Sequence, residues 1–146
     1  MLRVGIVNKS PYPIPNYGKI GNSGMDVRAF IPNPITLKPL ERILVPTGLY
    51  FDIPDGYEIQ VRPRSGLALK RGLTVLNTPG TLDANYTGEV GVILINLSSE
   101  EQTIEPGERV AQLVFSKVDF MELIEISEII KETERGSQGY GDSGRF

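Results

Sequence analysis

The chain has 146 residues, of which 15 are basic and 18 acidic, giving a formal net charge of −3, and it contains neither cysteine nor histidine. This length fits one domain, and the charge argues against a nucleic-acid polymer as partner. The missing residue types exclude disulfides, thiolate or Ser-His-Asp catalysis, and zinc held by sulfur or histidine. Carboxylates and a hard, oxygen-bound cation remain as catalytic equipment. The apolar runs are too short for a membrane span or a signal peptide, which predicts a soluble protein of the cytoplasm.

Short apolar segments, separated by 16 glycines and 11 prolines, predict an all-β fold. Residues Tyr57–Pro63 alternate apolar and polar side chains after an Asp-Gly turn, as a half-buried strand does. The next stretch, Ser65–Leu73, is predicted to be a short helix, with Ser65 as its N-cap and Gly72 as the residue that ends it.

The second half of the chain continues this pattern. Glu89–Leu97 is apolar nearly throughout, which predicts a strand covered on both faces, and Arg109–Val118 is predicted to be a further strand. Asp119–Thr133 has apolar residues at both helical and strand spacings, so periodicity does not decide between them. Apolar periodicity stops near Arg135, which places a boundary between a body of residues 1–134 and a glycine-rich tail of residues 135–146.

Five stretches carry polar residues that an ordinary β-sandwich does not require. They are Ser23–Phe30 (SGMDVRAF), Pro63–Gly72 (PRSGLALKRG), Asn77–Gly91 (NTPGTLDANYTGEVG), Gly107–Phe115 (GERVAQLVF) and the tail Arg135–Phe146 (RGSQGYGDSGRF). In this order and spacing they resemble the five motifs of the trimeric dUTPases, the dUTP diphosphatase family. One such stretch is weak support, because Pro-Gly-Glu turns before apolar strands are common, but five in register are specific.

The resemblance implies a β-sandwich or jelly-roll-like (β-clip) subunit with one short helix, assembled into a homotrimer whose active sites lie at subunit interfaces. Residues 1–134 would form the catalytic domain, and residues 135–146 a flexible arm that closes over the active site. The implied reaction is magnesium-assisted hydrolysis of dUTP to dUMP and pyrophosphate. Its implied role is to limit uracil incorporation into DNA and to supply dUMP for dTMP synthesis.

Asp83 lies beside a glycine-rich turn, in what is predicted to be a hairpin between strands. Taken by itself, an aspartate in a turn accepts hydrogen bonds from nearby backbone N–H groups. The resemblance implies instead that Asp83 deprotonates the water that attacks the α-phosphorus, which a carboxylate can do without histidine. Tyr86 resembles the tyrosine that packs on the deoxyribose and excludes a 2′-hydroxyl. The alternative for Tyr86 is a strand tyrosine that faces the core.

Four more residues of this stretch resemble positions that meet the uracil and the sugar. Uracil presents an acceptor, a donor and an acceptor along one edge, which extended backbone can match as a neighbouring strand would. Side-chain or backbone groups of Asn77, Thr81 and Leu82 are implied in this contact, and Gly91 is implied to allow close approach. Taken singly, each of the four is also compatible with an ordinary hairpin residue.

The implied triphosphate contacts come from three other stretches. Arg64, Ser65 and Gly66 lie at a predicted helix N-terminus, where unpaired N–H groups attract anions, although a simple cap and a solvated charge are the alternative. Gln112 is a polar residue in an apolar strand and resembles the glutamine that closes the base and phosphate pocket. Asp26 resembles an aspartate near the magnesium-bound triphosphate, which it would reach through a bound water. A surface aspartate entering a strand is the alternative.

The tail resembles a glycine-rich arm that folds over bound nucleotide, usually on a neighbouring subunit. Arg135 would pair with the γ-phosphate, Tyr140 would stack on the uracil, and glycines such as Gly141 would let the chain wrap closely. Two departures from the family pattern stand out: Asn85 replaces an acidic residue, and Asp142-Ser143 replaces a Ser-Thr pair. A carboxylate at position 142 repels a triphosphate unless it turns outward or meets the metal, which leaves Ser143 as the hydroxyl contact.

Two other functions are alternatives to this one. A dCTP deaminase resembles dUTPase in fold but uses a glutamate base in a related hairpin, so Asp83 followed by Tyr86 favours the diphosphatase. A zinc deaminase is excluded because the chain lacks histidine and cysteine. A non-catalytic trimeric β-sandwich would explain the strands but not five motifs in register.

Overall fold

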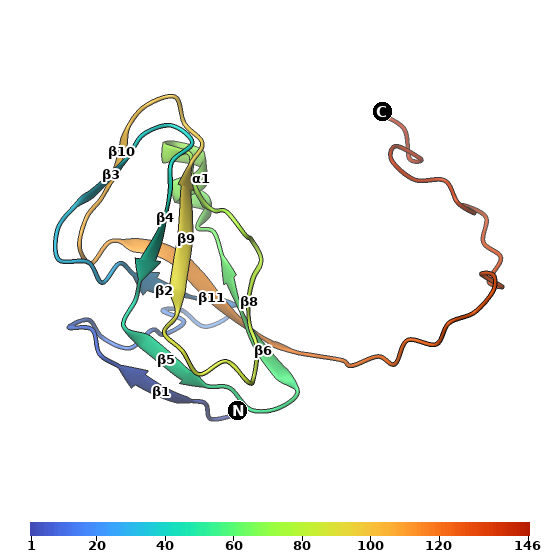
Figure 1. Ribbon diagram of the computed structural model, residues 1–146, viewed down its shortest axis with the longest axis horizontal. Coiled ribbons are helices and arrows are strands. Elements are labelled where there is room, and N and C mark those ends of the chain that lie inside the picture. Colours follow the sequence, from blue (N-terminus) through green and yellow to red (C-terminus); the bar gives the residue numbers. More distant parts are fainter.

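Eleven short β-strands and one helix make up the fold, and the computed structural model describes all residues from 1 to 146 (Figure 1). The strands are β1 (Gly5–Asn8), β2 (Gly24–Arg28), β3 (Ile35–Leu37), β4 (Arg42–Pro46), β5 (Leu49–Asp52), β6 (Tyr57–Arg62), β7 (Leu73–Val75), β8 (Gly80–Leu82), β9 (Gly91–Asn96), β10 (Gln102–Ile104) and β11 (Arg109–Lys117), and the helix is α1 (Ser65–Arg71). The all-β prediction with one short helix is confirmed.

All strand pairs are antiparallel and belong to four sheets. The largest sheet has the order β2-β11-β6-β8, and a three-stranded sheet has the order β4-β9-β7. Two further pairs, β1-β5 and β10-β3, complete the set. One hydrophobic cluster of 20 buried residues joins the two larger sheets, for example Val61 and Leu113 with Val92 and Leu94. The core therefore lies between these sheets, as in a sandwich.

The strands predicted from periodicity are present. In β6, Ile59 and Val61 are buried and Arg62 is exposed, which is the alternation that the sequence indicated. The strand predicted over Glu89–Leu97 is β9, and its consecutive residues Leu94 and Ile95 are both buried, so both faces are covered there. The last predicted strand is β11.

The predicted helix is present, but the prediction that Ser65 is its N-cap is wrong. Arg64 is the N-cap residue, with an extended backbone and no side-chain cap, and Ser65 is the first residue of α1. Gly72 ends the helix as predicted. It adopts a left-handed conformation (φ 63°), and a Cβ there would lie only 2.8 Å from the backbone N of Ser98. Both conditions require glycine.

The residues after β8 do not form the hairpin that the sequence suggested. β8 pairs with β6, whereas β9 pairs with β4 and β7, so residues 83–90 connect two different sheets. The pattern of turn residues between two strands does not reveal which partner each strand takes, and this explains the error.

The segment after β11 contains neither helix nor strand. Its last backbone hydrogen bond to the body runs from the Val118 N–H to the Gly56 carbonyl (2.9 Å), and every residue from Asp119 onward is exposed. Figure 1 shows it leaving the body and curving away as the orange-to-red tail. Residues 120–130, called the apolar strap below, carry seven exposed apolar side chains: Phe120, Met121, Leu123, Ile124, Ile126, Ile129 and Ile130.

Candidate active site

The outer face of the four-stranded sheet carries the polar residues. The register aligns Asp26 of β2, Gln112 of β11 and Arg62 of β6 in one row across the sheet. The adjacent row, which includes Val61 and Leu113, points the other way and is buried in the core. Because side chains alternate between the faces of a sheet, the polar row lies on the face away from the core.

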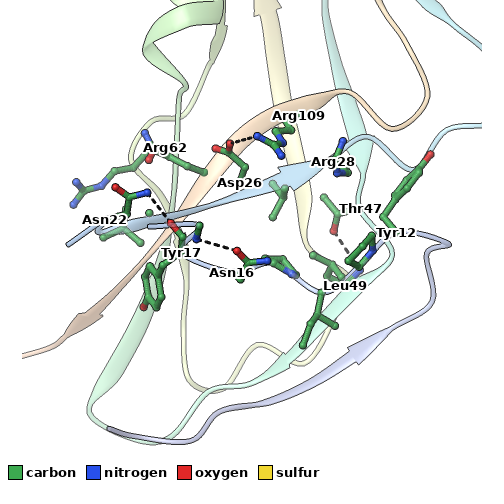
Figure 2. Close-up of a pocket in the computed structure, with 18 of the residues that line it drawn as sticks. Tyr12, Asn16, Tyr17, Asn22, Asp26, Arg28, Thr47, Leu49, Arg62 and Arg109 are labelled. Atoms are coloured by element: carbon green, nitrogen blue, oxygen red, sulfur yellow. Dashed lines mark hydrogen bonds and ion pairs between the residues drawn. The ribbon is translucent and has the colours of Figure 1, made fainter. Parts of the chain in front are cut away.

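Asp26 is held between two arginines. The Nε of Arg64 lies 3.1 Å from Oδ1 of Asp26, and Nη1 of Arg109 lies 3.6 Å from its Oδ2. Arg64 also donates to the main-chain oxygen of Arg109 (3.3 Å). Figure 2 shows Asp26 and Arg109 facing each other. Beside them lies a hollow of about 890 Å³, bordered mainly by residues 12–24 and by the polar face. The cluster has two cations and one carboxylate, which suits an anionic ligand.

Gln112 joins β11 to the start of α1. Its Nε2 donates to the Pro63 carbonyl at 2.9 Å, so the polar side chain in an apolar strand has its hydrogen bond. Its Oε1 occupies the space beside Gly24, where a Cβ would lie only 2.2 Å away. Gln112 also borders a second pocket of about 420 Å³ that has no hydrophobic lining residue and includes Ser65 and Thr78.

The start of α1 faces this region with free backbone donors. The first main-chain hydrogen bond at the helix start runs from the Ala68 N–H to the Arg64 carbonyl at 3.1 Å. The N–H groups of Ser65, Gly66 and Leu67 precede it and have no acceptor within the helix. Together with the Arg64 guanidinium, they form one side of the candidate phosphate site. The sequence correctly placed these groups at the start of a helix, and that they bind phosphate stays a prediction.

Asp83 and Tyr86 lie on the connection that follows β8. The Asp83 carboxylate is exposed and accepts no hydrogen bond, so the alternative that it caps the local turn has no support. Tyr86 is outside any strand, is 43% exposed and donates its hydroxyl proton to the Glu89 carbonyl (2.7 Å). The alternative that it faces the core therefore fails.

The implied uracil contacts flank the same edge. β8 is the outermost strand of its sheet, so one edge of its backbone is free to pair with a ligand. Thr81 and Asn77 are exposed, whereas the Leu82 side chain is buried in the core, so Leu82 can meet a ligand only through its backbone. Gly91 begins β9, and a Cβ there would lie 2.6 Å from Cδ1 of Leu44 on β4. The packing of β4 against β9 thus gives an independent reason for this glycine.

A single chain does not bring Asp83 to the arginine cluster. Leu82 lies opposite Ile59, so Asp83 comes level with Glu58, whereas Gln112 lies opposite Arg62 at the other end of β6. Four residues of strand correspond to roughly 13 Å, and two strand spacings separate β8 from β11 in addition. The chain therefore carries two separate half-sites, named here the phosphate half (Asp26, Arg64, Ser65, Gly66, Arg109 and Gln112) and the Asp83 half (Asn77, Thr81, Leu82, Asp83 and Tyr86).

The tail residues belong to neither half in this chain. Arg135, Tyr140, Gly141 and Ser143 belong to the exposed tail. Figure 1 shows this red segment away from the body. Arg135 pairs with Asp142 (Nε to Oδ2, 3.4 Å) and donates to the Gln138 carbonyl (2.6 Å). In this structure the Arg135 guanidinium is thus engaged within the tail.

Arg109 was missed by sequence reasoning. It lies three residues before Gln112, so strict alternation would place the two on opposite faces of β11. The pairing of β11 with β2 shifts register between Arg109 and Ala111, and this bulge turns Arg109 onto the face of Asp26. No residue type in the stretch signals a bulge, so the pattern of residues could not have indicated it.

The chain has no group of three or more carboxylates that could hold a metal ion by itself. The single helix, α1, has seven residues and is too short to span a membrane.

The fold and the polar face define an all-β protein with a candidate anion site at a sheet surface. The model of the dUTPase family matches residues 10–144. Proteins called deoxyuridine 5′-triphosphate nucleotidohydrolase are similar over nearly the whole chain. One from Finegoldia magna is 51% identical over 143 residues, covering 98% of this chain and 99% of the relative. Another, from Fusobacterium nucleatum, is 54% identical over 144 residues, covering 99% and 98%.

Solved dUTPase structures share the fold of this chain. A mutant of the Staphylococcus bacteriophage 80alpha dUTPase, solved with dUpNHpp, superposes with a TM-score of 0.87 at 24% identity, covering 99% of this chain and 100% of that one. The chain belongs to the dUTPase family, a family of enzymes. The resemblance noted in the sequence is therefore confirmed.

Proposed function

We propose that the protein hydrolyses dUTP to dUMP and pyrophosphate. The chain belongs to the dUTPase family, and relatives about 50% identical in sequence share the name of a dUTP-hydrolysing enzyme, which supports this activity. The observation that carries the proposal is the exposed carboxylate of Asp83, which accepts no hydrogen bond and lies beside Tyr86 next to the free edge of β8. A carboxylate without a partner is available to take a proton from water.

In the proposed mechanism, Asp83 accepts the proton of a water that attacks the α-phosphorus in line, and pyrophosphate leaves. Arg64 and Arg135 offset the charge of the triphosphate, which is the main means of catalysis in such transfers. The phosphate half holds the triphosphate through the free N–H groups of α1, and Gln112 closes the pocket.

The Asp83 half recognises the nucleoside. The free edge of β8 offers backbone groups to the uracil, and Thr81 and Asn77 lie beside it with exposed side chains. The ring of Tyr86 packs on the deoxyribose and leaves no room for a 2′-hydroxyl. Tyr140 of the tail stacks on the uracil, Ser143 adds a hydroxyl contact, and Gly141 lets the tail approach closely.

Magnesium fits this site as a companion of the triphosphate. The chain offers no carboxylate cluster, and Asp26 is already paired with two arginines. Magnesium keeps several waters and takes few protein ligands, so one carboxylate acting through a water suffices. A mutant dUTPase from phage phi11 of S. aureus reveals the coordination of a structural Mg(II) ion in that protein. When bound, magnesium supplies positive charge beside the phosphates.

Assembly into a homotrimer completes the site in this proposal. The Asp83 half of one subunit would meet the phosphate half of another, with the tail (residues 135–146) supplied by a neighbour, and residues 1–134 forming the body. Two observations support it: the two halves lie apart in one chain, and the apolar strap is uncovered. Exposed apolar surface of this extent marks an interface.

We place this activity in the cytoplasm, where it limits uracil incorporation into DNA and supplies dUMP for dTMP synthesis. The test is to offer dUTP, dCTP, dTTP and UTP with magnesium and to measure pyrophosphate and ammonia separately. Pyrophosphate from dUTP alone is expected. Ammonia from dCTP would indicate the deaminase of the same fold, and no product from any nucleotide would indicate a binding protein.

A further inference from the structure

Helix α1 has little to hold it in place. It has seven residues, too few for a helix that is stable by itself, and only Leu67 is buried. Leu69 is 87% exposed. The direction in which α1 presents Arg64 and Ser65 therefore depends on what ties its two ends to the sheet.

The N-terminal end is tied through residues already assigned to the phosphate half. Arg64 pairs with Asp26, and the Pro63 carbonyl accepts a hydrogen bond from Gln112. In the proposed function these contacts lie where the triphosphate binds, so phosphate would compete with Asp26 for the Arg64 guanidinium. A second anchor is needed to keep the helix in place during that exchange.

The C-terminal end is anchored by the main chain, where the Leu97 N–H donates to the Gly72 carbonyl (2.9 Å), and by the guanidinium of Arg71. Its Nη1 donates to Oε1 of Glu108, its Nη2 to the Thr103 carbonyl, and its Nε to Oε1 of Gln102 (3.2 Å). All three nitrogens of the side chain are therefore engaged. The Arg71 and Glu108 side chains are 29% and 22% exposed, so the pair is half-buried and only partly screened by water.

Glu108 connects this anchor to the rest of the phosphate half. Its second carboxylate oxygen accepts the Glu105 N–H at 2.9 Å, which fixes the turn before β11. Its carbonyl accepts the Ala29 N–H at 2.8 Å, just after β2. The anchor therefore joins α1, which follows Arg64, to β11, which carries Gln112, and to the end of β2, which carries Asp26.

We infer that Arg71 and Glu108 are positioning residues for binding of the triphosphate. They hold α1 so that Arg64 and the N–H groups of Ser65 and Gly66 point at the phosphates, and they touch neither the substrate nor the Asp83 half. This inference rests on the proposed function, because it assumes a phosphate ligand at the start of α1. Their loss lowers the affinity for pyrophosphate and for the triphosphate more than it lowers the affinity for the uracil and the sugar.

The test uses the full-length chain with Arg71→Ala, Arg71→Lys and Glu108→Gln. Lys70→Ala is the matched control, since Lys70 is the exposed neighbour on the same turn and makes no ion pair. For each variant, Tm, oligomeric state, kcat and KM for dUTP, and calorimetric affinities for pyrophosphate and dUMP are measured. A misplacement of about 1 Å can reduce rates on the order of a hundredfold, so effects of this kind are measurable.

For Arg71→Ala we expect KM for dUTP and the dissociation constant of pyrophosphate to rise at least about tenfold, with the dUMP affinity within about twofold and kcat changed less than KM. Arg71→Lys should show a smaller loss of affinity than Arg71→Ala, because lysine keeps the positive charge but lacks the planar guanidinium that donates to three partners. Glu108→Gln should show a smaller shift in the same direction, and Lys70→Ala should match wild type.

A lower Tm with unchanged KM and unchanged pyrophosphate affinity would make the pair purely structural and overturn the inference. Equal losses for dUMP and pyrophosphate would also overturn it, because the effect would then not be specific to phosphates. If Arg71→Ala does not fold, the affinities of Glu108→Gln for pyrophosphate and for dUMP test the inference in its place. If the wild-type protein fails to hydrolyse dUTP, the proposed function is wrong, and calorimetry with pyrophosphate still tests the anchor.

Discussion

The phosphate half and the Asp83 half differ in how firmly the chain holds their functional groups. In the phosphate half, Asp26, Arg64 and Gln112 all have partners within the same chain. In the Asp83 half, the Asp83 carboxylate has none, and the Tyr86 side chain makes one hydrogen bond, through its hydroxyl. In the proposed mechanism, the binding groups are thus pre-arranged by the chain itself, whereas the carboxylate of the proposed base is free to meet water. Substitutions confined to one half, and mixed assemblies that combine halves from different chains, test this difference.

The largest expected effect is on the reactive carboxylate. Asp83→Asn should reduce turnover of dUTP by about two to four orders of magnitude, because an amide cannot take a proton from water. Binding of a non-hydrolysable dUTP analogue should stay close to wild type, since the phosphate half is untouched. Rapid-quench kinetics and calorimetry measure the two quantities. Retention of more than about a tenth of the wild-type rate would remove Asp83 from the role of base.

Removal of the tail after Thr133 should come next. We expect kcat/KM to fall at least about a hundredfold, equivalent to roughly 2.7 kcal/mol, because stacking by Tyr140 and the phosphate contact of Arg135 are both lost. Stability should change by no more than about 1 kcal/mol, since the deleted residues are exposed. Thermal melts, size-exclusion chromatography and pyrophosphate release measure this. Full activity of the truncated chain would show that the tail takes no part in the reaction.

Mixing two inactive variants tests whether the halves meet across subunits. If Asp83→Asn and Arg64→Ala chains are unfolded and refolded together in equal amounts, about a quarter of the sites in random trimers should combine an intact Asp83 half with an intact phosphate half. Activity should then reach about a quarter of wild type, well above either variant alone. Each variant refolded separately is the control. No gain on mixing would place the whole site within one chain.

Tyr86→Ala should act on selectivity. Without the ring, the preference of kcat/KM for dUTP over UTP should narrow by about tenfold or more, the range over which a steric pocket discriminates one small group. Tyr86→Phe is the matched control, because it keeps the ring and loses only the hydrogen bond to Glu89. An unchanged ratio in the alanine variant would contradict the assignment of Tyr86 to the sugar.

The smallest effect is expected at the departure from the family pattern. Asp142 pairs with Arg135 in the free tail and must release it before Arg135 can meet phosphate. Exposed pairs contribute about 0–1 kcal/mol, so Asp142→Ser should lower KM for dUTP by at most about fivefold, and less at high salt. Asp142→Asn, with the same shape and no charge, should behave alike. A raised KM in both variants would indicate that Asp142 helps to hold the metal.

Much of the fold could be predicted, because local patterns determine it. Alternation in Tyr57–Arg62 identified β6, and Gly72 identified the end of α1. The three-residue strands β3, β7, β8 and β10 are too short for a period to be recognised. The hairpin prediction around Asp83 failed for a related reason, since pairing of β8 with β6 depends on contacts distant in sequence.

Site residues that belong to a recognised motif could be predicted from the sequence. Residues that join the site only because the fold brings them there could not. The motifs indicated Asp26, Arg64 and Gln112, which lie together. Arg109 reaches Asp26 only through a bulge, and Arg71 meets Glu108 only because the fold brings the end of α1 to the turn before β11. The apolar strap was ambiguous for a different reason: its side chains are exposed in their own chain, so packing selected neither period.

The apolar strap also affects how the protein matures. A newly made chain can fold its sandwich without residues 119–146, because these make no backbone hydrogen bond to the body. Until other copies cover the strap, as they would in the proposed trimer, its seven apolar side chains remain open to any other apolar surface, including an identical strap. Exposed apolar surface of this kind makes unassembled chains prone to aggregation. Recovery on refolding should therefore depend on concentration in two opposing ways, with too little protein leaving subunits unpaired and too much favouring precipitation.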